Sequence, residues 1–159
     1  SLLCEHHIRK VLKQRLTLFP KNKKEFSIPN GIYENNIYPD VIIDYGNNNV
    51  GVYDVKYKNF DFLNGVKRED KFQLITYVAS HLNKYNVVEC GIIYPLKESD
   101  FDKTLEMTDQ ILNIDKKEIP FKIGFYKICN DLKEQTKIDK EFGEQLSPAA
   151  NIVHSAFGG

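Results

Sequence analysis

The spacing of hydrophobic positions divides the chain into a series of helices and strands. Apolar residues recur at intervals of three and four over 2–19, which predicts an amphipathic helix that ends before Pro20. Two β-rich runs, at 41–43 and 50–57, flank Gly46-Asn47-Asn48-Asn49, a stretch that tolerates positive φ. This arrangement predicts a β-hairpin.

The rest of the pattern predicts an alternation of helices and strands. A helix is expected over 69–84, with an apolar face formed by Phe72, Ile75, Ala79 and Leu82. Further strands are expected at 26–28, 31–33, 87–94 and 121–128, and further helices at 104–114 and 149–156. The charged segment 133–140 is expected to be solvated. Such an order favours an α/β (α+β) fold, a mixed β-sheet flanked by helices on both faces.

Length and composition indicate one domain spanning residues 1–159. The chain is long enough to build a core without disulfides or metal. Lysine plus arginine number 22 and aspartate plus glutamate number 22, so any nucleic-acid binding must use a local patch. No apolar run approaches the ~18 residues of a membrane span, and no membrane partner is expected. Because the sequence begins Ser1-Leu2-Leu3, we expect a fragment of a longer chain.

The three cysteines, Cys4, Cys90 and Cys129, are far apart in the sequence and form no CxxC pair. This spacing disfavours a zinc or iron–sulfur site built from this chain alone. We expect reduced, buried thiols in a cytoplasmic protein. There is also no glycine-rich phosphate-binding loop and no GxSxG.

The predicted hairpin brings three charged side chains together. Asp54 and Lys56 are two residues apart on the second strand and therefore share a face. If the turn is centred near Asn47, Asp40 lies opposite Asp54, because both are seven residues from that centre. Two close carboxylates favour a proton or a divalent cation, and oxygen ligands suit Mg²⁺ or Mn²⁺. Such a metal can polarise a phosphodiester, while Lys56 orients water or offsets developing charge.

A solvated ladder of charges is the alternative interpretation of this hairpin, since Asp and Lys are common on polar strand faces. Against it, Asp54 and Lys56 interrupt an otherwise apolar strand that is expected to have helices on both sides. Charged groups on a central strand are costly unless they are paired or functional.

These residues resemble the PD-(D/E)xK nuclease motif, as Pro39-Asp40 followed by Asp54-Val55-Lys56. The longer run Asp54-Val55-Lys56-Tyr57-Lys58 resembles the D-x-K-Y-K of McrC-type nuclease subunits of modification-dependent restriction systems. Gln73-Leu74-Ile75-Thr76-Tyr77 is similar to the QxxxY motif of RecB-like and McrC-like nucleases, and Gly91-Ile92-Ile93-Tyr94-Pro95 is similar to a strand ending found there. The resemblance covers about residues 3–95.

The resemblance implies a restriction-endonuclease-like fold and a Mg²⁺- or Mn²⁺-dependent DNA endonuclease. Such an enzyme leaves 5′-phosphate ends and works with an AAA+ NTPase partner of the McrB type. The residues that it implies are the catalytic set Asp40, Asp54 and Lys56, the metal ligands Asp40, Asp54 and the main-chain carbonyl of Val55, and the supporting residues Glu5, Gln73 and Tyr77. This chain has Asp54 where Glu is the common form, and the shorter side chain makes the metal geometry tighter.

Several alternatives stay open. A RecB-like or Cas4-like DNA-processing nuclease is one, although the Cas4-like form needs four cluster cysteines. Another is a non-catalytic DNA-binding or assembly module of the same fold, but a degenerate copy usually loses one member of the catalytic set. Glu5 also suits the first turn of a helix, where the helix dipole favours an acid. Basic residues around the proposed site could contact phosphates or form a solvated surface: Lys58, Lys67, Arg68 and Lys71.

Overall fold

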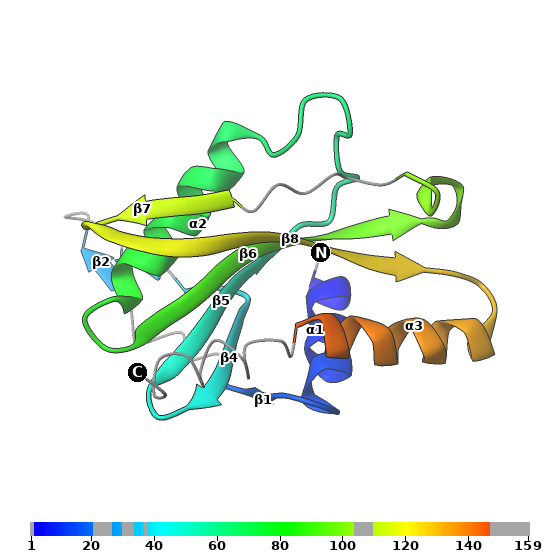
Figure 1. Cartoon of the computed structure of the whole chain (residues 1–159), viewed down its shortest axis with the longest axis horizontal. Coiled ribbons are helices and arrows are strands. Elements are labelled where there is room, and N and C mark those ends of the chain that lie inside the picture. Colours follow the sequence, from blue (N-terminus) through cyan, green and yellow to red (C-terminus); the bar gives the residue numbers. More distant parts are fainter. Residues whose placement is uncertain (1, 21–26, 30–33, 37, 104–109, 147–159) are drawn as a thin grey trace.

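A computed structural model describes residues 2–20, 27–29, 34–36, 38–103 and 110–146 (Figure 1). At its centre is a six-stranded mixed sheet with the strand order β1-β4-β5-β6-β8-β7. These strands are β1 (Thr17–Leu18), β4 (Val41–Gly46), β5 (Asn49–Val55), β6 (Asn86–Lys97), β7 (Gln110–Ile114) and β8 (Lys117–Ile128). A separate antiparallel pair is formed by β2 (Ser27–Pro29) and β3 (Glu34–Asn36). The α-helices of the described part are α1 (Leu2–Lys13), α2 (Arg68–His81) and α3 (Leu132–Gln145).

Helices cover both faces of the sheet, so the predicted fold class is confirmed (Figure 1). On one face, Leu74 of α2 packs in a cluster with Val52 of β5. On the other face, Ile8 of α1 and Phe142 of α3 pack in a second cluster with Ile93 of β6. None of the helices in the described ranges is long and apolar enough to cross a membrane.

The β4–β5 hairpin has the register that the sequence predicts. Val41 pairs with Tyr53, which places Asp40 one step beyond this end of the ladder, opposite Asp54. The turn residues 47–48 have φ values of 52° and 67°. Asn tolerates this left-handed region better than most residues, which explains why the turn forms here.

The N-terminal helix is shorter than the predicted 2–19. It ends at Lys13, and β1 (Thr17–Leu18) pairs antiparallel with β4 instead. Thr17 is β-branched and suits a strand, so Pro20 does not end the helix. The strand expected at 26–28 is found as β2, shifted by one residue, and 31–33 lies outside the described residues.

The helix predicted for 104–114 is wrong where the structure describes it, because Gln110–Ile114 is strand β7, antiparallel to β8. The turn between them is formed by residues 115–116, whose φ values are 48° and 62°. A Lys in that conformation is an uncommon turn signal, which is why the hairpin was missed. For the same reason β8 begins at Lys117, earlier than expected. Strand β6 continues through Pro95 to Lys97, because these residues pair with the end of β8.

The charged segment 133–140 belongs to α3, a helix that the pattern did not indicate. Asp131 caps it by accepting a hydrogen bond from the Glu134 amide at 2.9 Å. Only Ile138, Phe142 and Gly143 are buried on this helix, so its polar face dominates the sequence. The helix expected at 149–156 lies outside the described residues.

Helix α2 confirms the helix predicted at 69–84 but buries a different face. Phe72 is 52% exposed, whereas Leu74, Val78 and His81 are buried. These three follow the spacing of one helical stripe, and Asp70 extends the stripe by one more turn. Of the three cysteines, all free, only Cys90 is fully buried.

Candidate active site

Asp40 lies just before β4 and is held from two directions. Its Oδ2 accepts a hydrogen bond from the amide of Val55, the last residue of β5, at 2.8 Å. The side chain of Arg9, on α1, donates to the main-chain carbonyls of Asp40 at 2.7 Å and of Phe19 at 3.0 Å. Helix α1 therefore fixes the backbone before β4, while β5 fixes the carboxylate.

Asp54 is a buried acid on the sheet face that α2 covers, with 2% of the residue exposed. Burial raises its pKa to about 7; Lys56 opposes this shift, and a hydrogen bond and the charge of Asp40 add to it. Among the described residues, Asp54 Oδ2 has no hydrogen-bond partner, although Lys56 Nζ is 2.6 Å away. That contact is an ion pair, and a carboxylate oxygen has more than one lone pair, so the oxygen keeps acceptor capacity.

The Lys56 ammonium lies between β5 and α2. It donates to Gln73 Oε1 at 2.5 Å and is 3.5 Å from Asp70 Oδ1, besides its contact with Asp54. Gln73 in turn donates to the Tyr77 hydroxyl at 2.7 Å. Gln73 and Tyr77 are one turn apart on α2. The structure thus joins Lys56, Gln73 and Tyr77 in a single chain of contacts beside the acids.

Asp70, at the start of α2, is a site residue that the sequence analysis missed. It is 5% exposed and accepts hydrogen bonds from Lys58 at 2.9 Å and from the Tyr94 hydroxyl at 3.3 Å. Burial acts to raise the pKa of Asp70, but Lys58 and Lys56 outweigh it and lower the pKa. The sequence does contain a signal for Asp70, because it lies on the same helical face as the apolar Leu74. An acid on a buried helical face needs partners.

Glu5 is buried on α1 near the same end of the sheet. Burial, followed by the charges of Asp40 and Glu5, raises the pKa of Tyr57 to about 12, so this phenol lies among the acids. Within the described ranges, no group of three or more His, Cys, Asp or Glu side chains could hold a metal ion. The structure therefore brings together the Asp40–Asp54 pair but not a three-carboxylate cluster that includes Glu5.

The predicted basic residues surround the start of α2. Lys58 is anchored on Asp70, and its side chain is 42% exposed. Lys67 and Arg68 are exposed, and Lys71 is half-buried. The Arg68 guanidinium lies 4.9 Å from the centre of the Phe72 ring.

The residues present fit a hard divalent cation such as Mg²⁺ or Mn²⁺. Asp40 and Asp54 offer adjacent carboxylates, and Asp54 Oδ2 has no hydrogen bond among the described residues. The Val55 amide points toward Asp40, and the carbonyl of a strand residue points to the same side as its amide. Val55 therefore directs a third oxygen toward this point, and oxygen donors are what these ions prefer.

A family model described as McrBC 5-methylcytosine restriction system component matches residues 3–95. The chain belongs to this family. The matched residues contain the whole site described above, from Glu5 on α1 to Tyr94 on β6. The resemblance found in the sequence covers the same residues.

A solved structure extends the likeness of this McrBC-family chain beyond β6. One chain of the Thermococcus gammatolerans assembly of McrB AAA+ hexamers with bound McrC is similar, with a TM-score of 0.54 and 17% sequence identity. The similarity covers 89% of this chain and 31% of that chain. At this identity it shows a shared fold, and the present chain spans less than a third of its neighbour. No curated protein matches.

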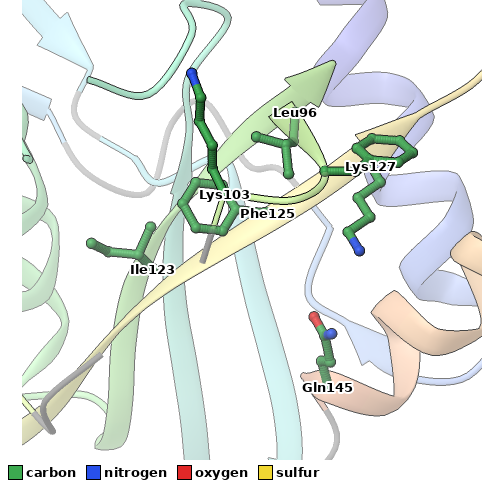
Figure 2. A pocket seen from close by; sticks show the side chains of 7 residues that line it. Leu96, Lys103, Ile123, Phe125, Lys127 and Gln145 are labelled. Carbon is green, nitrogen blue, oxygen red and sulfur yellow. The ribbon is translucent and has the colours of Figure 1, made fainter. Parts of the chain in front are cut away.

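A surface pocket of about 310 Å³ lies on the neighbouring strands β6 and β8 of the McrBC-family chain. Figure 2 shows its lining residues, which are Leu96, Phe101, Lys103, Ile123, Phe125, Lys127 and Gln145, all but Phe101 labelled. Ile92 pairs with both Asp54 and Ile123, so the pocket begins two strands, or about 10 Å, from the carboxylate pair. The ammonium groups of Lys103 and Lys127 lie 5.3 Å and 5.2 Å from the centres of aromatic rings.

Proposed function

We propose that this chain is the metal-dependent DNA endonuclease part of a McrBC restriction system, hydrolysing phosphodiester bonds with Mg²⁺ or Mn²⁺. The observation that carries the proposal is the juxtaposition of Asp40, Asp54 and Lys56. A buried carboxylate oxygen lies beside a second carboxylate and 2.6 Å from an ammonium. Membership of a restriction-system family supports the same role.

Each side chain of the site has a distinct part in this chemistry. Asp40, Asp54 and the Val55 carbonyl would hold the cation, which when bound polarises the scissile phosphate and lowers the pKa of its water. Lys56 stands on the same face and would orient the attacking water or stabilise the charge that develops on the phosphate. Gln73, itself bonded to Tyr77, limits the movement of Lys56. The products would carry 5′-phosphates.

An AAA+ NTPase of the McrB type is the proposed partner. The similar solved assembly is described as McrB AAA+ hexamers with bound McrC, which supports this pairing. DNA is the proposed substrate, and the neutral net charge requires a local binding surface. We propose that the basic residues at the start of α2 and the two lysines of the pocket form it: Lys58, Lys67, Arg68, Lys71, Lys103 and Lys127.

Cleavage of supercoiled plasmid DNA tests the proposal. We expect nicking and linearisation with Mg²⁺, the partner and a nucleoside triphosphate, and none when EDTA replaces the metal. Asp54→Asn should abolish cleavage, whereas Asp44→Asn is the matched control, because Asp44 bonds only the nearby Gly46 amide among the contacts described for it. Cleavage that persists in EDTA, or in Asp54→Asn at the parent rate, would overturn the proposal.

A further inference from the structure

Asp70 is a buried carboxylate whose partners all come from outside its own helix. Lys58 Nζ donates to Oδ1 at 2.9 Å and lies 2.7 Å from Oδ2. The Tyr94 hydroxyl donates to Oδ2 at 3.3 Å, and Lys56 Nζ is 3.5 Å from Oδ1. Both oxygens are therefore engaged, and the two cations come from the chain that continues β5.

The Lys56 ammonium is shared between two carboxylates on different elements. Asp54, on β5, is 2.6 Å away and Asp70, on α2, is 3.5 Å away. The third contact, Gln73, is a neutral amide. Among these three contacts, Asp70 is therefore the only other negative charge, and it attracts the ammonium away from Asp54.

We infer that Asp70 is the positioning residue for both lysines of the site. It balances the attraction of Asp54 for Lys56, so that the ammonium stays between the two acids and can face a phosphate. It also holds Lys58 at the solvent-exposed edge of the site, where 42% of that side chain is exposed. The catalytic consequence rests on the proposed nuclease function, whereas the arrangement of the ammonium groups does not.

Side-chain NMR of the full chain tests the arrangement directly. Lysine ammonium protons give sharp signals when ion pairs and hydrogen bonds slow their exchange with water. Asp70→Asn should remove the Lys58 signal and shift that of Lys56. Glu69→Gln is the matched control, since it removes the same charge one residue away at an exposed position, and it should leave both signals unchanged. If Asp70→Asn does not fold, Asp70→Glu keeps the charge but displaces the carboxylate, and the Lys56 signal must still shift.

Cleavage with Mg²⁺ and the partner tests the consequence. Asp70→Asn should lower kcat about 10–100-fold, as loss of an orienting partner does in other sites, with a smaller rise in KM from the release of Lys58. Asp70→Glu should recover part of kcat, and Glu69→Gln should match the parent. A parent without cleavage refutes the nuclease proposal and leaves the NMR result to decide the positioning. Unchanged Lys56 and Lys58 signals in Asp70→Asn, or a loss confined to KM, would overturn the inference.

Discussion

The contacts of Lys56 explain why a charged residue is tolerated at the end of a buried strand. Its side chain is only 14% exposed, and the ammonium contacts Asp54, Asp70 and Gln73. Burying an ammonium without partners is costly, and each of these contacts offsets part of that cost. The solvated-ladder interpretation of the hairpin therefore does not describe this residue.

Replacing Lys56 by Ala should reduce the cleavage rate on the order of 10²–10³-fold, because a preorganised electrostatic donor is lost beside the reacting phosphate. Lys58→Ala should cost less and act mainly through DNA affinity and its salt dependence. Single-turnover cleavage in the presence of the partner measures both. Equal rates for the parent and Lys56→Ala, with unchanged circular dichroism, would show that Lys56 is not catalytic.

The raised pKa of Asp54 should make the metal-free protein less stable as pH rises. Burial raises this pKa from 3.8 to about 7 in the folded state, so between these values the folded chain binds a proton that the unfolded chain has lost. Stability linked to this group is therefore full below pH 3.8 and is lost as pH rises toward about 7. Thermal melts in EDTA should show this fall in the parent and a smaller one in Asp54→Asn; parallel pH curves for the two would contradict it.

Added Mg²⁺ should raise the melting temperature of the parent, since a ligand of the folded state stabilises it by mass action. Asp54→Asn should gain much less, because one ligand becomes a weaker neutral donor. Asp44→Asn, on the same hairpin, should gain as much as the parent. An equal gain for Asp54→Asn would remove Asp54 from the ligand set.

The residues of the hairpin could be predicted from the sequence, whereas those held by helix docking could not. The alternation of strand faces and a two-residue turn place Asp40, Asp54 and Lys56 together, and both signals are local. The contact of Asp70 with Lys56 depends on how α2 lies across the sheet, which no local pattern specifies. Arg9 was missed for the same reason, because its acceptors are main-chain carbonyls.

Among the elements, those with strong local signals were predicted and those with mixed signals were not. The β4–β5 hairpin has apolar runs around an Asn-rich turn. Helix α2 is a 14-residue segment without Gly or Pro, which favours a helix, although its weak amphipathic pattern indicated the wrong buried face. Strand β7 was missed because its pairing with β8 decides its conformation, as tertiary context often does for short segments. Helix α3 was missed because its segment is mostly charged and only three of its residues are buried, although its few apolar positions do fall on one helical face.

Gly91, on β6, should not tolerate a side chain. A Cβ there would lie 2.3 Å from the Lys122 carbonyl oxygen and 2.7 Å from the ring of Tyr53. Gly91→Ala should lower the free energy of unfolding by about 1–3 kcal/mol and displace β5, which carries Asp54. Gly124→Ala is the control on β8, where the nearest atom is 3.4 Å away, so its denaturation midpoint should stay close to the parent's. Equal midpoints for both variants would show that β6 has room at Gly91.

At the scale of the whole molecule, the site forms where segments distant in the sequence meet at one end of the sheet. Asp40 precedes β4, Asp54 is near the end of β5, and Asp70 is in the first turn of α2. The pocket on β6 and β8 continues the same face, and it lies partly beyond the residues that the family model matches. The proposed DNA contacts of Lys103 and Lys127 therefore involve residues outside the matched segment.

The neutral net charge leads us to expect that the chain binds DNA weakly by itself and depends on the proposed AAA+ partner for cleavage. With 22 basic and 22 acidic residues, only the local basic surface favours a polyanion, and few phosphate contacts give a shallow salt dependence. Cleavage should rise steeply when the partner and a nucleoside triphosphate are added, while Lys67→Ala should weaken DNA binding and reduce the salt slope by about 1 without changing kcat. Titrating salt in binding assays of the chain, the partner and the two together separates these contributions. If the chain alone cleaves DNA as fast as the complex, the partner does not deliver the substrate, and the local basic surface is sufficient for binding.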